Sequence, residues 1–187
     1  YKNQTDYFKP NNNSSDSLNS FKLENTNYCN WGEVIDVSIF YGRQEELSTL
    51  ERWMVTDRCR LVMLNGLGGM GKTVLSLRIA QQIQNNFDRA IWRSLNDSPT
   101  LEELLINLIN FLSPKRETEV CLPDTLAGKI SRLIECLRDC RCLLILDGVD
   151  TILQPNSHAG DFQPGYENYG ELFKRLGESN HQSCLLL

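Results

Sequence analysis

The residues best suited to chemistry in this sequence form a glycine-rich stretch that ends in a lysine and a threonine. Residues 66–73 fit the pattern G-x-x-x-x-G-K-[ST], in which successive backbone N–H groups surround phosphate oxygens. Lys72 offers a mobile charge to the β and γ phosphates, and Thr73 offers a hydroxyl to Mg²⁺. Glycines allow a positive φ and leave no Cβ in the path of the anion. We expect this of Gly66, Gly68, Gly69 and Gly71.

The sequence on either side of this stretch favours a phosphate site over a chance glycine-rich turn. Residues 61–64 are an apolar run of strand character, and residues 74–83 carry apolar side chains at helical spacing. A helix that begins near Lys72 would add the partial positive charge of its N-terminus. The predicted nucleotide-binding residues of this loop are Gly66, Gly68, Gly69, Met70, Gly71, Lys72, Thr73 and Val74.

A second apolar run ends in a carboxylate. Residues 142–147 read Cys-Leu-Leu-Ile-Leu-Asp, which is typical of a parallel strand buried on both faces. Such a strand would place Asp147 near Thr73, where it can hold Mg²⁺ directly or through water; an Asp that caps a turn is the alternative. Hydrolysis also requires a group that positions and activates water. Asp150 is the nearest catalytic candidate, and a solvated loop acid is the alternative there.

The elements that must position these groups alternate between strands and helices. This alternation predicts an α/β fold with three layers, αβα, and a mainly parallel sheet. Strands are expected at 60–65, 89–95, 142–147 and 183–187, and the helix that follows Thr100 begins with a capping box. Residues 1–30 are rich in Asn and Ser and are expected to be a disordered linker, with the domain at 31–187. Because the chain starts at Tyr1 and stops inside an apolar run, we expect a fragment truncated at the C-terminus.

Composition narrows the class of protein. A net charge of −5 over 187 residues gives no basic footprint for nucleic acid, and no apolar stretch approaches the roughly 20 residues of a membrane helix. Seven cysteines without a regular framework indicate reduced thiols in a cytoplasm rather than disulfides or a metal site. An Asn/Thr-Lys-x-Asp guanine reader is absent from the sequence, so a GTPase is not expected.

Three stretches together resemble an NB-ARC domain of the STAND class of signalling ATPases. They are residues 40–47, residues 66–73 and residues 143–147. The second strand, residues 90–95, is similar to the segment that those domains carry there. The sequence as a whole also resembles bacterial, cyanobacterial-type NB-ARC proteins with C-terminal WD-repeat propellers.

The resemblance implies a cytoplasmic ADP/ATP switch with Mg²⁺, in which ADP holds a resting form and ATP allows opening and homo-oligomerisation. It assigns the adenine and ribose side of the pocket to Phe40, Tyr41, Gly42 and Arg43. It also implies that the winged-helix region and a propeller lie outside this chain. The family commonly has an acidic residue directly after the Mg²⁺ aspartate, where this sequence has Gly148. Asp150 would then have to substitute, or hydrolysis would be slow.

Two other functions remain open at this point. An ordinary P-loop ATPase or kinase with multiple turnover would need an efficient base and a substrate pocket. A degenerate domain that uses its fold only as an interaction surface is disfavoured by the intact Lys72, Thr73 and Asp147.

Overall fold

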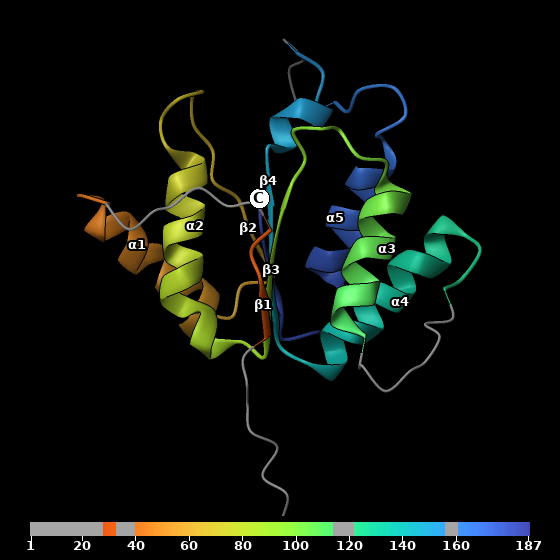
Figure 1. The fold of residues 1–187 in the computed structure, drawn as a ribbon, viewed down its shortest axis with the longest axis horizontal. Helices are drawn as coiled ribbons and strands as arrows, with labels where there is room; N and C mark the ends of the chain where they lie inside the picture. The colour runs from red at the N-terminus through yellow and green to blue at the C-terminus, as the bar shows by residue number, and fades with distance from the viewer. Residues whose placement is uncertain (1–27, 33–39, 114–121, 156–160) are drawn as a thin grey trace, which may run out of the picture.

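A parallel sheet lies between two layers of helices (Figure 1). The computed structural model describes residues 28–32, 40–113, 122–155 and 161–187. Within these residues, five strands follow the order β1-β3-β4-β5-β2, and every neighbouring pair is parallel. The strands are β1 (Tyr28–Asn30), β2 (Leu61–Val62), β3 (Arg89–Ser94), β4 (Cys142–Asp147) and β5 (Cys184–Leu186). The predicted three-layer α/β architecture is confirmed.

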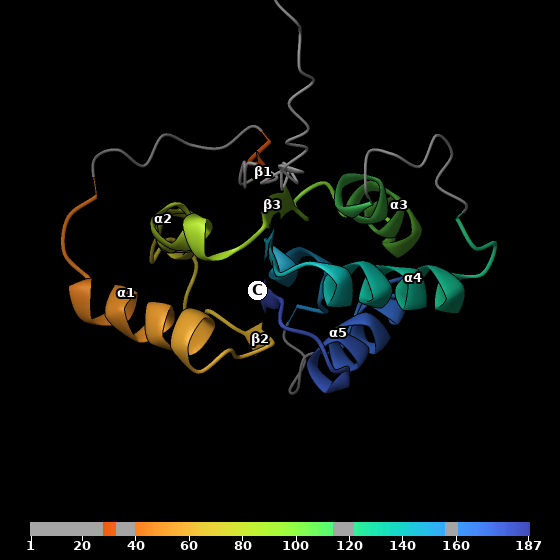
Figure 2. The same cartoon turned by 90° about the horizontal axis from the view of Figure 1, so that it is seen from below.

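Helices cover both faces of the sheet, as Figure 2 shows in the view from below. Helices α1 and α2 lie on one face, and α3, α4 and α5 lie on the other. The α-helices are α1 (Gln44–Glu51), α2 (Lys72–Ile83), α3 (Leu101–Leu112), α4 (Leu126–Asp139) and α5 (Asn168–Glu178). Shorter turns of other helix types are η1 (Arg52–Thr56), η2 (Gln84–Asn86) and η3 (Val149–Ile152).

Strand β4 is buried on both faces, as its unbroken apolar sequence predicts. Leu144 and Leu146 pack into the core beneath α3, α4 and α5, whereas Leu143 and Ile145 pack into the core beneath α1 and α2. All four side chains are at most 1% exposed. Burial on both sides fixes the register of β4, and this register sets the position of Asp147 at its end.

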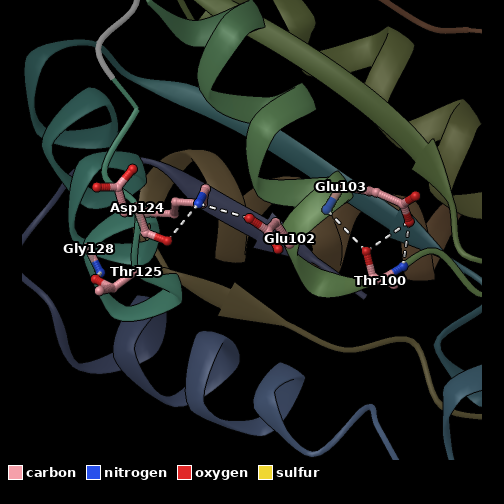
Figure 3. Close-up of polar contacts among 7 residues, drawn as sticks. Thr100, Glu102, Glu103, Asp124, Thr125 and Gly128 are labelled. Atoms are coloured by element: carbon pink, nitrogen blue, oxygen red, sulfur yellow. Dashed lines mark hydrogen bonds and ion pairs between the residues drawn. The ribbon is translucent and has the colours of Figure 1, made fainter.

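Polar contacts at the starts of α3 and α4 fix these two helices beside each other (Figure 3). The predicted capping box is present: Thr100 Oγ1 accepts from the Glu103 N–H at 3.3 Å, and the Thr100 N–H donates to Glu103 Oε2 at 2.9 Å. In the same first turn of α3, Glu102 Oε1 lies 2.9 Å from the ammonium of Lys129, a buried residue of α4. Thr125 caps α4 by accepting from the Gly128 N–H.

Three predicted boundaries differ from the structure. Residues 28–30 fall within the segment expected to be linker, but they form β1, where Cys29 pairs with Ala90 and the Tyr28 ring stacks on Phe111. β1 is a short edge strand in a polar segment, so the sequence pattern did not predict it. The rest of the segment predicted to be a linker, residues 1–27, lies outside the described residues. The regular strand β2 covers only two of residues 60–65. The spacing of Leu47, Leu50 and Met54 predicts one helix of about 12 residues, but in the structure this helix changes to a π-helix at Arg52.

Cysteines within the described ranges carry no disulfide. The thiols of Cys136, Cys142 and Cys184 are buried as small apolar groups, which supports the interpretation as reduced thiols. In that same part of the chain, the helices are all too short or too polar to cross a bilayer.

Candidate nucleotide-binding site

The glycine-rich loop turns at its last two glycines. Gly69 and Gly71 both have φ of 77°, a left-handed conformation that glycine adopts without strain. A Cβ at either position would meet no atom within 4 Å, so backbone conformation rather than crowding requires glycine there. Gly66 and Gly68 do not have the positive φ that we expected of them. The turn therefore uses two of the four glycines.

Helix α2 begins directly after the loop, and its N-terminus has no side-chain cap. Gly71 is the N-cap residue, it cannot accept from the first-turn N–H groups, and the first turn holds no acidic residue. Four N–H groups at a helix start have no intrahelical acceptor, and they need side chains, water or an anion. This N-terminus is thus available to phosphate oxygens.

Lys72 folds back over the loop. Its ammonium donates to the carbonyl oxygens of Gly66 at 2.8 Å and Leu67 at 3.3 Å. These contacts hold Nζ on the concave side of the loop, where the resemblance places the β and γ phosphates. Lys72 therefore lies in position to exchange a carbonyl oxygen for a phosphate oxygen.

The two predicted Mg²⁺ ligands meet at the carboxyl end of the sheet. Thr73 Oγ1 lies 2.9 Å from each carboxylate oxygen of Asp147. The first turn of α2 supplies the hydroxyl, and the end of β4 supplies the carboxylate. Residues that are far apart in sequence thus form a pair of hard oxygen donors, the kind that Mg²⁺ prefers.

The carboxylate of Asp147 is held in a setting that disfavours its charge. Burial of the half-buried side chain raises its pKa, and the hydrogen bond from Thr73 opposes this. The negative charge of Asp150 raises the pKa of Asp147 further, and Lys72 lowers it. A cation between these groups would relieve both burial and repulsion. The residues present therefore fit a divalent metal ion.

Asp150, the predicted catalytic residue, is exposed on η3 and does not contact Thr73 in the way that Asp147 does. It lines a cavity of about 400 Å³ together with Lys72 and Asp147. The structure thus brings Asp150 to the same cavity as the loop and leaves its carboxylate open to solvent.

Arg43 connects helix α1 to the loop. Its guanidinium donates to the carbonyl oxygen of Met70, and its backbone occupies the left-handed region, with φ of 56°, at the N-cap of α1. Gly42 before it also has a positive φ, of 77°. Phe40 packs against the core beneath α1 and α2, whereas Tyr41 is 89% exposed. The structure thus places Arg43 at the loop and Tyr41 in solvent.

A second cavity, of about 540 Å³, lies between α1 and the loop. Arg43, Met70 and Lys72 line it, and so does Trp53, an aromatic residue that the sequence analysis did not select. Trp53 is 39% exposed, so part of this large residue is accessible from solvent. The signal in the sequence was weak, because Trp53 is a single large aromatic residue beside the core positions Leu50 and Met54.

Comparison with known proteins agrees with this geometry. Residues 43–154 match the sequence pattern of the NB-ARC domain family. Across 168 residues, or 86% of the chain, the sequence is 46% identical to an uncharacterized WD repeat-containing protein of the cyanobacterium Nostoc sp.. An uncharacterized protein of Mycobacterium tuberculosis is 34% identical across 61% of the chain. A probable disease resistance protein of Arabidopsis thaliana is 27% identical across 61% of the chain.

The chain spans only part of these relatives, namely 13%, 27% and 12% of their respective lengths. The matched region contains the loop, the Thr73–Asp147 pair and Arg43, which are the features that the geometry brings together. Because the match covers more than half of its residues, the chain belongs to the NB-ARC family of nucleotide-binding domains.

Proposed function

We propose that this domain binds ADP and ATP with Mg²⁺ and serves as a nucleotide-dependent conformational switch within a larger signalling protein. The observation that carries the proposal is the loop that leads into an uncapped helix N-terminus, with Lys72 on one side and the Thr73–Asp147 pair on the other. An anion is attracted by the helix and the lysine, and a divalent cation by the carboxylate. A nucleoside di- or triphosphate with its metal supplies both charges.

The Thr73 hydroxyl and the Asp147 carboxylate would hold the metal. A bound Mg²⁺ would supply positive charge to offset that of the phosphate oxygens. The chain's own contribution is to keep the two ligands 2.9 Å apart across the sheet edge. The register of β3 and β4 supports the position of Asp147 at the sheet edge, because Asp147 pairs with Ser94 at the ends of these two parallel strands.

The adenosine side is proposed for the cavity between α1 and the loop. Arg43 and Trp53 line its wall, and one planar cation beside one aromatic ring suits a purine and a ribose. Gly42 and Arg43 shape the entry through their left-handed backbones, and Phe40 anchors that segment in the core. Tyr41 and Val74 are also proposed to contact the nucleotide.

A switch is favoured over an efficient enzyme because the site has a weak candidate for a general base. The carboxylate of Asp150 is exposed, and Gly148 follows Asp147 where a second acid would stand closer. The alternative, a catalytic ATPase or kinase with multiple turnover, requires Asp150 to activate water. Replacing Asp150 with Asn separates these functions, since only in the alternative does it abolish a fast turnover while nucleotide binding persists.

The domains that accompany the switch are proposed from the resemblance and from the relatives. One of them is named as a WD repeat-containing protein, so we propose that a winged-helix region and a WD-repeat propeller accompany this domain and contact it. Homo-oligomerisation in the ATP state and a cytoplasmic location complete the proposal. The net charge of −5 supports a function without nucleic acid, and no membrane partner is proposed.

The test uses the full-length protein. Denaturation of the purified protein should release ADP that mass spectrometry identifies, and the Lys72→Ala variant should release little. Hydrolysis should be slow or limited to one turnover. Sustained turnover in the ordinary enzyme range of about 1–1000 per second, without an effector, would refute the switch. Failure to bind any adenine nucleotide would refute the whole proposal.

A further inference from the structure

Asn96, which follows β3, comes into unusually close contact with Gly148, which follows β4. A Cβ built on Gly148 would lie only 2.4 Å from Asn96 Oδ1 and 3.2 Å from Asn96 Cγ. Gly148 also has a φ of 82°, a conformation that side chains rarely adopt. The amide of Asn96 therefore occupies the space into which a side chain at 148 would project.

The backbone around this contact is fixed by hydrogen bonds on both sides. The Leu95 N–H donates to the Asp147 carbonyl at 2.7 Å. Thr151 Oγ1 lies 2.7 Å from the carbonyl oxygens of both Leu95 and Gly148, and its single proton can be donated to either. The Asn96 N–H itself donates to Ser94 Oγ at 3.1 Å. These bonds join the end of β3 to the turn after β4, so the position of Asn96 is determined by the sheet.

Asn96 shares a cavity with the metal-binding pair. The cavity measures about 600 Å³, and its walls include Asn96, Thr73 and Asp147. Asn96 is an exposed residue, and its side-chain oxygen lies beside Gly148. An amide oxygen accepts hydrogen bonds from water and is a suitable partner for water bound to a hard cation.

We propose that Asn96 is a positioning residue for water at the metal side of the nucleotide site and that it holds the place of an acidic residue after Asp147. This inference rests on the proposed binding of ATP. It concerns a residue that is remote in sequence from the glycine-rich loop and from Asp147. It also explains how the site can orient water without a base at 148.

The chemistry that follows is limited by the amide. In ATP hydrolysis, a water oxygen bonds to the γ phosphorus, the bond from phosphorus to the bridging oxygen breaks, and its electrons remain on ADP. The proton that the water loses must pass to a phosphate oxygen or to solvent. Asn96 can accept a hydrogen bond from that water but cannot take its proton, because an amide is not basic at neutral pH. Asn96 can therefore orient water but cannot activate it.

This assignment predicts which position can accept an acid. A carboxylate introduced by Asn96→Asp would stand where the amide stands, beside the metal-binding pair. Gly148→Asp would instead have to adopt the left-handed backbone and displace Asn96. We therefore expect Asn96→Asp to raise the rate of single-turnover hydrolysis about 10-fold or more, since positioned general bases contribute about 100- to 10,000-fold. Asn96→Ala should lower the wild-type rate about 3- to 10-fold, the effect of one lost hydrogen bond.

The first experiment tests the contact itself and needs no nucleotide. Thermal melting is measured for the wild type, Gly148→Ala, Asn96→Gly and the double variant. We expect Gly148→Ala to lower the Tm by several degrees and Asn96→Gly to restore part of that loss, because the double variant keeps the strained φ but loses the clash. If Gly148→Ala alone fails to fold, folding of the double variant demonstrates the same coupling. Strictly additive changes would overturn the proposed contact.

The second experiment tests the role in hydrolysis. Single-turnover rates and ADP dissociation constants are compared for the wild type, Asn96→Ala and Asn96→Asp. The control is Asn110→Asp, which makes the same chemical change at an exposed position of α3. Of these variants, only Asn96→Asp should show a hydrolysis rate that increases with pH, because its new carboxyl group ionises. Wild-type affinity with unchanged hydrolysis in both Asn96 variants would overturn this inference alone. Loss of ADP binding by the wild type would instead overturn the proposed function.

Discussion

Replacing Lys72 with alanine gives the sharpest test of the site. In the structure, Nζ donates to two neutral carbonyl oxygens of its own loop, at 2.8 and 3.3 Å. On binding, it can exchange these for a charged phosphate oxygen, and a charge-assisted hydrogen bond contributes about 1.5–3 kcal/mol. The variant should therefore bind ADP about 10- to 100-fold more weakly. Its unfolding free energy should change by less than about 1 kcal/mol, since both carbonyls remain accessible to water.

The assay is isothermal titration calorimetry with Mg²⁺ and ADP on protein freed of bound nucleotide, with circular dichroism as the check of fold. Lys174→Ala, on the exposed surface of α5, removes the same charge away from the loop and serves as the matched control. Both variants should retain the wild-type spectrum, and only the first should lose affinity. Equal dissociation constants for the two variants would refute the assignment of Lys72 to phosphate.

Four further substitutions test the metal ligand and the helices that pack beside it. Because the pKa of Asp147 is raised above its ordinary value of about 3.9, the nucleotide-free protein should lose stability as pH rises from there through the raised pKa. Asp147→Asn should remove that step from Tm measurements across pH 4–7, and it should also remove the Mg²⁺-dependent part of ADP affinity. Glu102→Gln leaves the buried Lys129 ammonium with a weaker partner and should reduce the urea-measured unfolding free energy by about 1–3 kcal/mol. Lys129→Met, which removes that charge, should be the milder change. Thr100→Ala removes the capping box of α3 and should cost about 1 kcal/mol in the same urea assay.

The sequence predicted those parts of the fold that depend on local pattern. β4 is a single apolar run, α3 has a capping box and an apolar face, and both lie where the periodicity places them. The loop and Asp147 were found because their chemistry requires fixed residue types at fixed spacing. The pairing of Asp147 with Thr73 then follows from the topology of a parallel sheet, whose strands end at one edge.

The remaining features arise from contacts between distant segments, and no local pattern reports them. Strand β1 is three residues long within a polar segment and is defined by pairing with β3. Trp53 acquires its place at the loop through the packing of α1 against α2, which adjoins the loop. In the sequence, Gly148 stood out only because the family commonly has an acidic residue at that position. The close approach of Asn96 becomes visible once β3 and β4 are placed in register.

The contacts of the glycine-rich loop also indicate how occupancy of the site could reach the rest of the domain. Arg43, the N-cap residue of α1, donates to the Met70 carbonyl, while Lys72 begins α2 and donates to the Gly66 carbonyl. Both helices are thus joined at their N-terminal ends to the same short loop. Under the proposed switch, we expect a phosphate that takes the Lys72 contact to alter the loop to which Arg43 is bonded. A ligand couples to conformation only if its binding free energy differs between two arrangements, and these contacts give α1 and α2 a route to such a difference.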